Sequence, residues 1–451
     1  IDILNIYMLM NPNTQNLLKI DNLCISINKN DIIKDVSIQI NKGEMIGLVG
    51  ESGCGKSLTA LSIIKLIDEN VMKVKSGEIQ FLGKNLLSKT EKELEKIRGK
   101  EISMIFQEPM TSLNPVFSIG DQINEVLFIH NNLSKKIATD KTIDLLSKVG
   151  IPRPEISYKK YPHQLSGGQR QRVMIAMALA CSPKLLIADE PTTALDVTIQ
   201  AQILDLMTKL KKEFGMSILF ITHDLGLVRE FSDKVCVMQN GKIVEQGDTK
   251  QVFENPQHQY TKKLLDAEPI PKSIINLKSS PLIEIKDLNV FYSLDGANFF
   301  KKNKFHAVKD VSLNIFKNTT IGLVGESGSG KSTLGKAIAN LVNYDGEIFF
   351  DGADISLSKK ELKKDIQIIF QDPYGSLSPR MTIGEIVGEG LGVHFDLKKD
   401  ETNKKIDKVL NDVGINTEAK NKYPHEFSGG QRQRIAIARS LIMNPAFMIL
   451  D

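Results

Sequence analysis

The amino-acid sequence predicts an α/β fold, built as two copies of one domain that each contain a largely parallel sheet. The main observation is an internal repeat, because "IGLVGESGCGKSLT" at residues 46–59 recurs as "IGLVGESGSGKSTL" at residues 321–334. Short apolar runs such as "MIGLVG" and "KLLIAD" are typical of buried strands, and they alternate with amphipathic helical segments. In both copies a glycine-rich loop separates such a strand from a helix, an arrangement that holds phosphate groups.

The repeats also divide the chain. A second motif, "IFQEPMTSLNP" at residues 105–115, recurs as "IFQDPYGSLSP" at residues 369–379. A stretch rich in proline and serine between the copies is typical of a linker. The predicted segments are an N-terminal leader (1–16), a first domain (17–265), a linker (266–281) and a second domain (282–451). Because the sequence begins with Ile1 rather than Met, we expect it to be part of a longer chain.

Composition excludes several classes of protein. The chain has 451 residues, of which 41% are hydrophobic and 25% charged, as in ordinary globular proteins. A formal net charge of +4 gives no reason to expect nucleic-acid binding. No apolar run approaches the ~18 residues of a membrane span. The four cysteines form no C-x-x-C pair, which argues against a zinc site or a disulfide framework and fits a reducing cytoplasm.

The glycine-rich loop of the first copy fits the pattern G-x-x-x-x-G-K-[ST]. Gly50, Gly53 and Gly55 allow successive backbone N–H groups to curl around phosphate oxygens, and the following helix adds its positive N-terminus. We expect Lys56 to reach the β- and γ-phosphates of a nucleotide and Ser57 to ligate magnesium. The corresponding residues of the second copy are Gly325, Gly328, Gly330, Lys331 and Ser332.

A phosphate loop needs a distant carboxylate for its magnesium, and "KLLIADEPTTALD" at residues 184–196 supplies one. Asp189 ends an apolar run and can hold the ion through water, whereas Glu190 is placed to polarise an attacking water. Glu190 could instead be a surface carboxylate, which is the less common case for an Asp-Glu pair, and the phosphate loop further favours the catalytic interpretation. His223 follows another apolar run in "FITHDL", a position where a lone histidine is usually structural.

The order of these motifs resembles that of the ATP-binding-cassette ATPases, and the resemblance covers the chain from Leu17 onward. It implies tandem cassettes, each with a RecA-like phosphate-loop core, an antiparallel β subdomain and a helical signature subdomain. It also implies ATP and Mg²⁺ as cofactors. In that family two cassettes close head to tail and bind ATP between them, within one chain or between two copies.

The resemblance assigns a role to a second pair of repeats, "HQLSGGQRQRVMIAMALA" at residues 163–180 and "HEFSGGQRQRIAIARSLI" at residues 425–442. Their serines are implied to cap the γ-phosphate of ATP held by the opposite cassette, not to act as nucleophiles. A hydroxyl, glycine N–H groups and a helix N-terminus suit an anion of this kind. The residues concerned are Ser166, Gly168, Ser428 and Gly430.

Further roles follow from the same resemblance. Gln107 and Gln371 couple the magnesium site to the partner cassette, and His223 contacts the γ-phosphate. The implied magnesium ligands are Ser57, Gln107, Asp189, Ser332, Gln371 and Asp451. The catalytic groups implied are Glu190, His223, Gln107 and Gln371.

Two departures from the family pattern stand out. An aromatic residue near the end of the first strand stacks on adenine in this family; Tyr292 fits that place in the second copy, but the first copy has Ile27. Base stacking is worth ~1–3 kcal/mol, so we expect weaker adenine binding by the first copy. The second departure is the ending at Asp451, where the family has a glutamate next, and we expect the natural chain to continue with one.

Finer motifs resemble the peptide and nickel importer ATPases: "YPHQLSGGQRQR" (161–172), "SLNP" (112–115) and "VFENPQHQYTKKLLDAEP" (252–269). The last stretch is also typical of a docking helix, because Tyr260, Leu264 and Leu265 share one face, and both interpretations can hold. The tandem arrangement resembles the fused importers of the oligopeptide, glutathione and microcin-C type. This implies two transmembrane permease subunits, a periplasmic or lipoprotein substrate-binding protein, and a peripheral place on the cytoplasmic face of the inner membrane.

The alternative is a soluble tandem-cassette ATPase acting on ribosomes or DNA. The translation-factor type normally has a long charged helical linker between its cassettes, and the DNA-repair type carries zinc-binding cysteine pairs. Neither feature occurs in this sequence. The sequence therefore favours import of a peptide.

Overall fold

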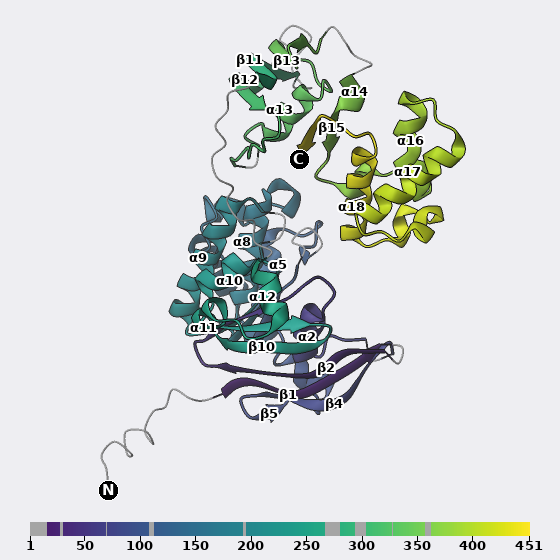
Figure 1. Cartoon of the computed structure of the whole chain (residues 1–451). Coiled ribbons are helices and arrows are strands. Elements are labelled where there is room, and N and C mark those ends of the chain that lie inside the picture. The colour runs from purple at the N-terminus through teal and green to yellow at the C-terminus, as the bar shows by residue number, and fades with distance from the viewer. Residues whose placement is uncertain are drawn as a thin grey trace. The chain divides into compact units, whose positions relative to one another are not determined.

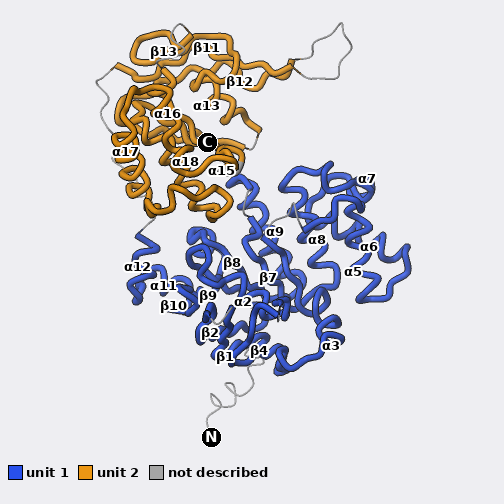
Figure 2. The backbone as a smooth tube through the Cα atoms, turned by 90° about the vertical axis from the view of Figure 1, so that its right-hand side faces the viewer, with its two compact units in different colours: residues 1–272 blue, residues 273–451 orange. Residues whose placement is uncertain are grey.

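The chain forms two compact units, residues 1–272 and 273–451, shown in blue and orange in Figure 2. The structure is a computed structural model that describes residues 16–27, 30–68, 70–107, 112–192, 195–266, 280–293, 304–326, 328–356 and 362–451. The predicted leader and linker lie outside the described residues except at their ends. Asn16 belongs to the first strand of unit 1, and Pro281 begins the first strand of unit 2.

A six-stranded sheet in the order β10-β9-β3-β8-β7-β6 is the centre of unit 1. Five of its strands are parallel, and only β10 runs antiparallel to its neighbour β9. The strands are β3 (Met45–Val49), β6 (Ile102–Ile105), β7 (Leu185–Asp189), β8 (Ser217–Ile221), β9 (Lys234–Gln239) and β10 (Lys242–Asp248). The predicted parallel α/β core is thus confirmed for this unit.

The apolar runs form strands because both faces of the sheet are covered. Side chains alternate between two separate cores. In β7, Leu186 and Ala188 enter one core, whereas Leu185 and Ile187 enter the other. A continuous apolar run therefore satisfies both faces, and polar side chains occur where the strand ends, at Asp189.

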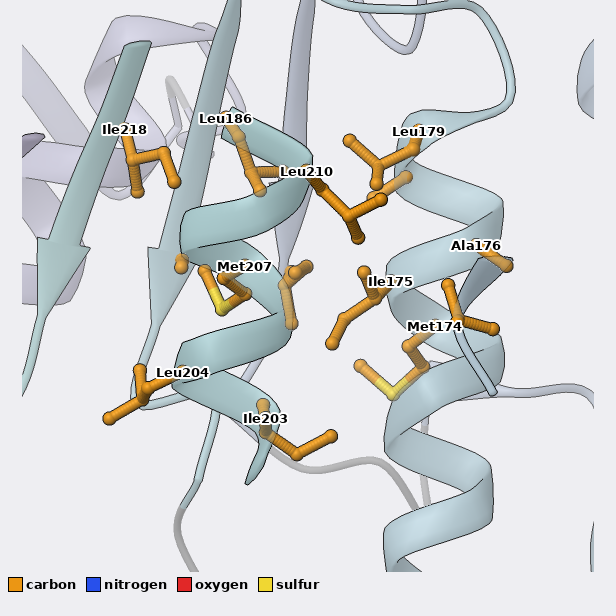
Figure 3. Close-up of a cluster of buried hydrophobic side chains, with 14 of the residues drawn as sticks. Met174, Ile175, Ala176, Leu179, Leu186, Ile203, Leu204, Met207, Leu210 and Ile218 are labelled. Atoms are coloured by element: carbon orange, nitrogen blue, oxygen red, sulfur yellow. The ribbon is translucent and has the colours of Figure 1, made fainter. Parts of the chain in front are cut away.

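Helices cover the first face. Helix α9 (Val197–Phe214) contributes Ile203, Met207 and Leu210, spaced by four and three residues along one side of the helix. They pack against α8 (Gly167–Leu179), as Figure 3 shows. The side chains labelled there are Met174, Ile175, Ala176, Leu179, Leu186, Ile203, Leu204, Met207, Leu210 and Ile218.

An antiparallel four-stranded sheet, in the order β2-β1-β4-β5, packs on the second face. Its central strand β1 pairs with β2 and β4, so that Ile20 lies between Ile38 and Ile79. All three are buried, and the apolar side of this sheet closes the second core of unit 1. The strands are β1 (Asn16–Ile27), β2 (Asn30–Asn41), β4 (Met72–Phe81) and β5 (Lys84–Asn85).

A helical subdomain follows β6 in the chain and ends with α8. Its members are α5 (Ile119–Asn131), α6 (Lys135–Lys148), α7 (Pro154–Ser157), the short 3₁₀ helix η1 (Pro162–Gln164) and α8. Its helices α5 and α8 lie side by side (Figure 1). The remaining helices of unit 1 are α2 (Lys56–Ile63), α3 (Glu91–Glu95), α10 (Leu225–Phe231), α11 (Thr249–Glu254) and α12 (Gln259–Asp266).

Unit 2 repeats these parts. An antiparallel sheet in the order β12-β11-β13-β14 corresponds to that of unit 1, and β15 pairs in parallel with β16. Its strands are β11 (Pro281–Ser293), β12 (Lys304–Phe316), β13 (Asp345–Phe350), β14 (Ala353–Asp354), β15 (Ile366–Ile369) and β16 (Phe447–Leu450). Its helices are α13 (Lys331–Ile338), α14 (Leu362–Asp365), α15 (Pro373–Ser376), α16 (Ile383–His394), α17 (Lys399–Asp412), η2 (Thr417–Asn421), η3 (Pro424–Glu426) and α18 (Gly429–Leu441).

One predicted strand is wrong for unit 2. Residues 321–324 have the same sequence as residues 46–49 of β3 but form no strand, and Val324 is 88% exposed where Val49 of β3 is fully buried. In unit 1, β3 is held between β8 and β9, which both follow β7 in the chain. In the described part of unit 2 the corresponding parallel sheet contains β15 and β16, and neither strand pairs with residues 321–325.

Two further findings bear on the predictions. Among the described residues, no helix is both long and apolar enough to cross a membrane. All four cysteines have free thiols, of which Cys54 and Cys236 are buried and Cys24 and Cys181 are partly buried.

Candidate active site

The predicted phosphate loop of unit 1 connects β3 to α2. Gly50 and Gly55 have φ angles of 152° and 111°, which side chains disfavour. A Cβ atom at Gly50 would lie 2.2 Å from the carbonyl oxygen of Met238. Gly55 is the N-cap residue of α2, with no side chain to cap the first N–H groups of the helix. The loop therefore leaves backbone N–H groups for an anion.

Lys56 lies inside this loop and is only 5% exposed. Its Nζ donates hydrogen bonds to the carbonyl oxygens of Gly50, at 2.7 Å, and Glu51, at 3.0 Å. The backbone thus fixes the ammonium group in the concave side of the loop. A positive charge next to free N–H groups suits the phosphates predicted from the sequence.

Ser57 and Asp189 meet beside the loop, as the sequence predicts for a magnesium site. The Ser57 hydroxyl donates to Asp189 Oδ1 over 3.1 Å, and Asp189 is 4% exposed. Burial raises the pKa of the Asp189 carboxyl above its usual value, and the charge of Glu190 adds to this. The hydrogen bond from Ser57 and the charge of Lys56 act in the opposite direction.

These oxygens fit a magnesium ion. Mg²⁺ is usually bound by one or two protein oxygens together with phosphate oxygens and waters. A carboxylate and a hydroxyl in contact supply such a pair. Within the described ranges no group of three or more histidine, cysteine or acidic side chains could hold a metal ion.

Glu190 lies at the centre of three predicted catalytic side chains. Its Oε2 accepts a hydrogen bond from Gln107 Nε2 over 3.0 Å, and its Oε1 lies 3.2 Å from His223 Nδ1. The Glu190 side chain is 13% exposed, and that of His223 is 63% exposed. The backbone of Glu190 has a φ of 46°, a conformation that is uncommon for a residue with a side chain and that occurs often at functional sites.

Three elements bring this group together. Glu190 follows β7, Gln107 lies two residues after β6, and His223 lies two residues after β8. The three strands are parallel neighbours, so their carboxyl ends meet at one edge of the sheet. The arrangement can hold a carboxylate in one orientation toward a water molecule, which is what a general base requires.

Unit 2 repeats the phosphate loop geometry. Lys331 Nζ donates to the carbonyl oxygens of Gly325 and Glu326 over 2.7 and 2.6 Å. The Ser332 hydroxyl donates to Asp451 Oδ1 over 2.6 Å, as Ser57 does to Asp189. The loop glycines with positive φ are Gly325, Gly328 and Gly330. Gln371 lies two residues after β15, as Gln107 lies after β6.

The signature serines begin helices, as predicted. Ser166 Oγ accepts the backbone N–H of Gln169, and Ser428 Oγ accepts that of Gln431. In each pair a second, reciprocal hydrogen bond forms, in which the glutamine Oε1 accepts the backbone N–H of the serine. This capping box fixes each serine at the N-terminus of α8 or α18. These hydrogen bonds stay within each helix, and no described bond joins either serine to the phosphate loop of its own unit. Gly168 and Gly430 lie in the first turns of the same helices.

Tyr292, the predicted adenine-stacking residue, is half-exposed near the end of β11. It pairs with Phe305 of β12. Two residues further along β12, the carbonyl oxygen of Ala307 would be 2.4 Å from a Cβ atom at Gly330. The end of this hairpin therefore lies against the phosphate loop. In unit 1 the matching position, Ile27, pairs with Asn30.

One contact of the site was not predicted. The backbone N–H of Glu51, the second residue of the phosphate loop, donates to Tyr260 Oη over 3.1 Å. The sequence shows Tyr260 as part of the motif at residues 252–269 and as one residue on the face of a docking helix, and neither pattern predicts a contact with the phosphate loop. The two residues are 209 positions apart, and nothing in the local pattern marks them as neighbours.

The sequence was compared with known protein families and with known proteins, and it matches both. The sequence profile described as "ABC transporter" matches residues 33–193 and 308–451, and that described as "Oligopeptide/dipeptide transporter, C-terminal region" matches residues 244–288. The chain is 50% identical to the peptidoglycan transport ATP-binding protein YejF of Agrobacterium fabrum, covering 97% of this chain and 82% of the relative.

Two other relatives are similar over nearly the same length. An uncharacterized ABC transporter ATP-binding protein, YejF of Escherichia coli, is 46% identical over 97% of this chain and 85% of the relative. The glutathione import ATP-binding protein GsiA of Salmonella paratyphi A is 44% identical over 93% of this chain and 74% of the relative.

Proposed function

The chain belongs to the ABC transporter family of ATP-binding proteins, and from this premise we propose that it is the ATP-binding subunit of an importer for peptides. Proteins of this family are ATPases that bind ATP, and this chain is one of them. The observation that carries the import assignment is the segment that follows the first cassette, because it matches the C-terminal region of oligopeptide and dipeptide transporters.

In the proposed reaction, a water molecule attacks the γ-phosphorus of ATP and the bond to the β–γ bridging oxygen breaks. Glu190 accepts the proton of that water, while Gln107 and His223 hold its carboxylate in position. Lys56 and the loop N–H groups stabilise the negative charge of the phosphates. Ser57, Asp189 and Gln107 would hold Mg²⁺, which when bound neutralises charge on the phosphate oxygens.

A partner cassette completes each site in this proposal. The phosphate loop of one cassette would bind the nucleotide, and the signature serine of the other would cap its γ-phosphate. Site one combines Lys56, Ser57, Gln107, Asp189, Glu190 and His223 with Ser428 and Gly430. Site two combines Lys331, Ser332, Gln371 and Asp451, with Tyr292 on the adenine, and Ser166 and Gly168. The partner is the other cassette of the chain or that of a second copy.

The proposed partners are two transmembrane permease subunits and a substrate-binding protein, with the chain peripheral on the cytoplasmic face of the inner membrane. The names of its relatives support a class of solute for this proposal, because one is a glutathione import protein and another a peptidoglycan transport protein. Glutathione and the stems of peptidoglycan are both short peptides. We therefore propose short peptides as the substrate class.

Co-expression tests the assignment. The chain should fractionate in the supernatant when it is expressed alone, and with membranes when its proposed permease partners are co-expressed. Vesicles containing the complex should take up a short peptide, glutathione or a peptidoglycan-derived peptide in an ATP-dependent manner. Co-sedimentation with ribosomes in both conditions, with no uptake, would favour the ribosome-acting alternative.

A further inference from the structure

The phosphate loop of the first cassette is hydrogen-bonded to the segment that follows the cassette. Tyr260, in the first turn of α12, is 7% exposed, and its Oη accepts the backbone N–H of Glu51 over 3.1 Å. Burial raises the pKa of the Tyr260 hydroxyl, so it is neutral at physiological pH and acts as a stable acceptor. The bond joins the start of the loop to a helix outside the nucleotide-binding core.

A carboxylate on the sheet fixes the beginning of this helix. Glu245 of β10 accepts the backbone N–H of Gln257 over 2.8 Å and that of His258 over 3.0 Å. His258 Nδ1 then accepts the backbone N–H of Tyr260 over 3.2 Å. Burial alone would raise the pKa of Glu245, but these N–H groups lower it below its usual value. Tyr260 is thus fixed by hydrogen bonds at both its backbone N–H and its side-chain hydroxyl.

The same part of the sheet supports the loop at other points. Gly241, in the turn between β9 and β10, donates its backbone N–H to the carbonyl oxygen of Cys54 over 3.0 Å. At Gly50 the loop passes so close to Met238 of β9 that no side chain fits there. The β9–β10 hairpin therefore holds the loop directly, and through Glu245 it also holds the helix that carries Tyr260.

We propose that Tyr260 is a positioning residue for ATP binding, which fixes the phosphate loop of the first cassette in its nucleotide-binding conformation. In this inference the segment that carries α12 is a structural part of the nucleotide site. This inference rests on the proposed nucleotide site at Lys56. In this inference the segment affects the affinity for ATP and does not affect the rate of the chemical step.

Affinity changes because an ordered loop binds more tightly than a mobile one. With the bond to Tyr260, the loop has its binding conformation before the nucleotide arrives, so little ordering cost remains at binding. Glu190, Gln107 and His223 lie on other loops and keep their own contacts. Loss of the bond should therefore raise the dissociation constant of ATP and leave kcat nearly unchanged.

The Tyr260→Phe variant isolates the hydroxyl, because the phenyl ring still fills the same place in the core. Its matched control is Tyr158→Phe, which removes a hydroxyl that bonds Asn124 in the helical subdomain. Both variants are made in the full chain with Lys331→Ala, which confines strong binding to the first phosphate loop. The probe is Mg²⁺ with a non-hydrolysable ATP analogue, measured by titration calorimetry, together with kcat for ATP.

We expect Tyr260→Phe to raise the dissociation constant by about 3-fold to 10-fold, as for loss of one neutral hydrogen bond. Tyr158→Phe should change it by less than about 2-fold. Glu245→Gln should weaken binding in the same direction, and the double variant should be no worse than Tyr260→Phe alone, because both act through one contact. Additive losses would indicate general damage to packing and would overturn the inference.

A dissociation constant for Tyr260→Phe within about 2-fold of its parent, or lower than its parent, would also overturn it. Lys56→Ala distinguishes this failure from failure of the proposed function. If Lys56→Ala abolishes binding while Tyr260→Phe has no effect, the nucleotide site stands and the positioning role falls. If Lys56→Ala binds normally, the proposed site itself is wrong.

Discussion

Asp189 and Glu190 are neighbouring carboxylates with different surroundings. Asp189 is buried at the end of β7 and its oxygen accepts the hydroxyl of Ser57. Glu190 turns away with a positive φ, and its two oxygens contact an amide and an imidazole. One residue is thus placed to hold a cation and the other to accept a proton, although only one peptide bond separates them.

The catalytic role of Glu190 can be tested by removing its charge. Glu190→Gln keeps the size of the side chain but cannot accept a proton, so hydrolysis should fall by at least ~10²-fold, the usual scale for a general base. Binding of ATP should persist. The measurement is steady-state phosphate release together with nucleotide binding, with the exposed Glu230→Gln as control. Near-normal turnover in Glu190→Gln would contradict the assignment.

Some of these residues could be predicted because their chemistry is local. Lys56, Ser57 and Asp189 follow from short patterns at the ends of apolar runs, where a parallel sheet presents its polar groups. The bonds from Gln107 to Glu190 and from Glu51 to Tyr260 join residues 83 and 209 positions apart. Such contacts depend on the packing of whole elements, and no spacing in the sequence encodes them.

At the scale of elements, the signature helix has two tasks that use the same serine. Ser428 caps α18 by accepting the N–H of Gln431, and in the proposed function it also faces the γ-phosphate of a partner site. The first task stabilises the helix, and the second binds the γ-phosphate. A substitution that preserves the helix cap but repels the γ-phosphate would separate the two tasks.

Ser428→Asp is such a substitution. Aspartate caps helices about as well as serine, so the free energy of unfolding should change by less than about 0.5 kcal/mol, whereas Ser428→Ala should lose ~1 kcal/mol. A carboxylate facing the γ-phosphate is repelled, so Ser428→Asp should lower hydrolysis at least ~10-fold. Denaturant unfolding and phosphate release are the measurements, with Ser134→Asp at the N-cap of α6 as control. Normal hydrolysis in Ser428→Asp would remove the serine from the site.

The pentapeptide "IGLVG" shows what an element needs beyond its own sequence. In unit 1 its first four residues belong to β3, where Leu48 and Val49 are fully buried and the strand lies between two others. In unit 2 residues 321–325 have the same sequence but form no strand. Strand formation reflects packing against neighbours as much as intrinsic preference, so local sequence predicts this strand only where its neighbours are present.

Supplying neighbours should therefore restore the strand. If residues 190–248, which contain β8, β9 and β10, are appended after Asp451, residues 321–325 should become buried in the sheet of unit 2. Their amide hydrogen exchange should slow on the order of 100-fold, because a core strand opens only with the surrounding structure. An appended glycine-serine segment of equal length is the control. Equal exchange rates in the two chains would show that this segment has another reason to stay unpaired.

At the scale of the whole molecule, the two copies share a framework but differ in their chemical groups. Both phosphate loops hold a lysine and a serine in the same way, and both signature helices have the same cap. The predicted α/β cassettes with antiparallel and helical subdomains are confirmed, whereas the division into leader, linker and domains stays a prediction. The copies differ at the predicted adenine position, where the first has Ile27 and the second has Tyr292.

The repeated phosphate loops predict separate effects of their two lysines. Lys56→Ala removes the charge that faces the phosphates at the site containing Glu190, so single-turnover hydrolysis should fall at least ~10²-fold. Lys331→Ala removes the corresponding charge of the second loop, so it should weaken ATP binding there. Lys212 is an exposed lysine of α9, and the control variant Lys212→Ala should match the parent chain. Near-normal single-turnover hydrolysis in Lys56→Ala would contradict the assignment, because the lysine charge would then not be needed at the site where Glu190 activates water.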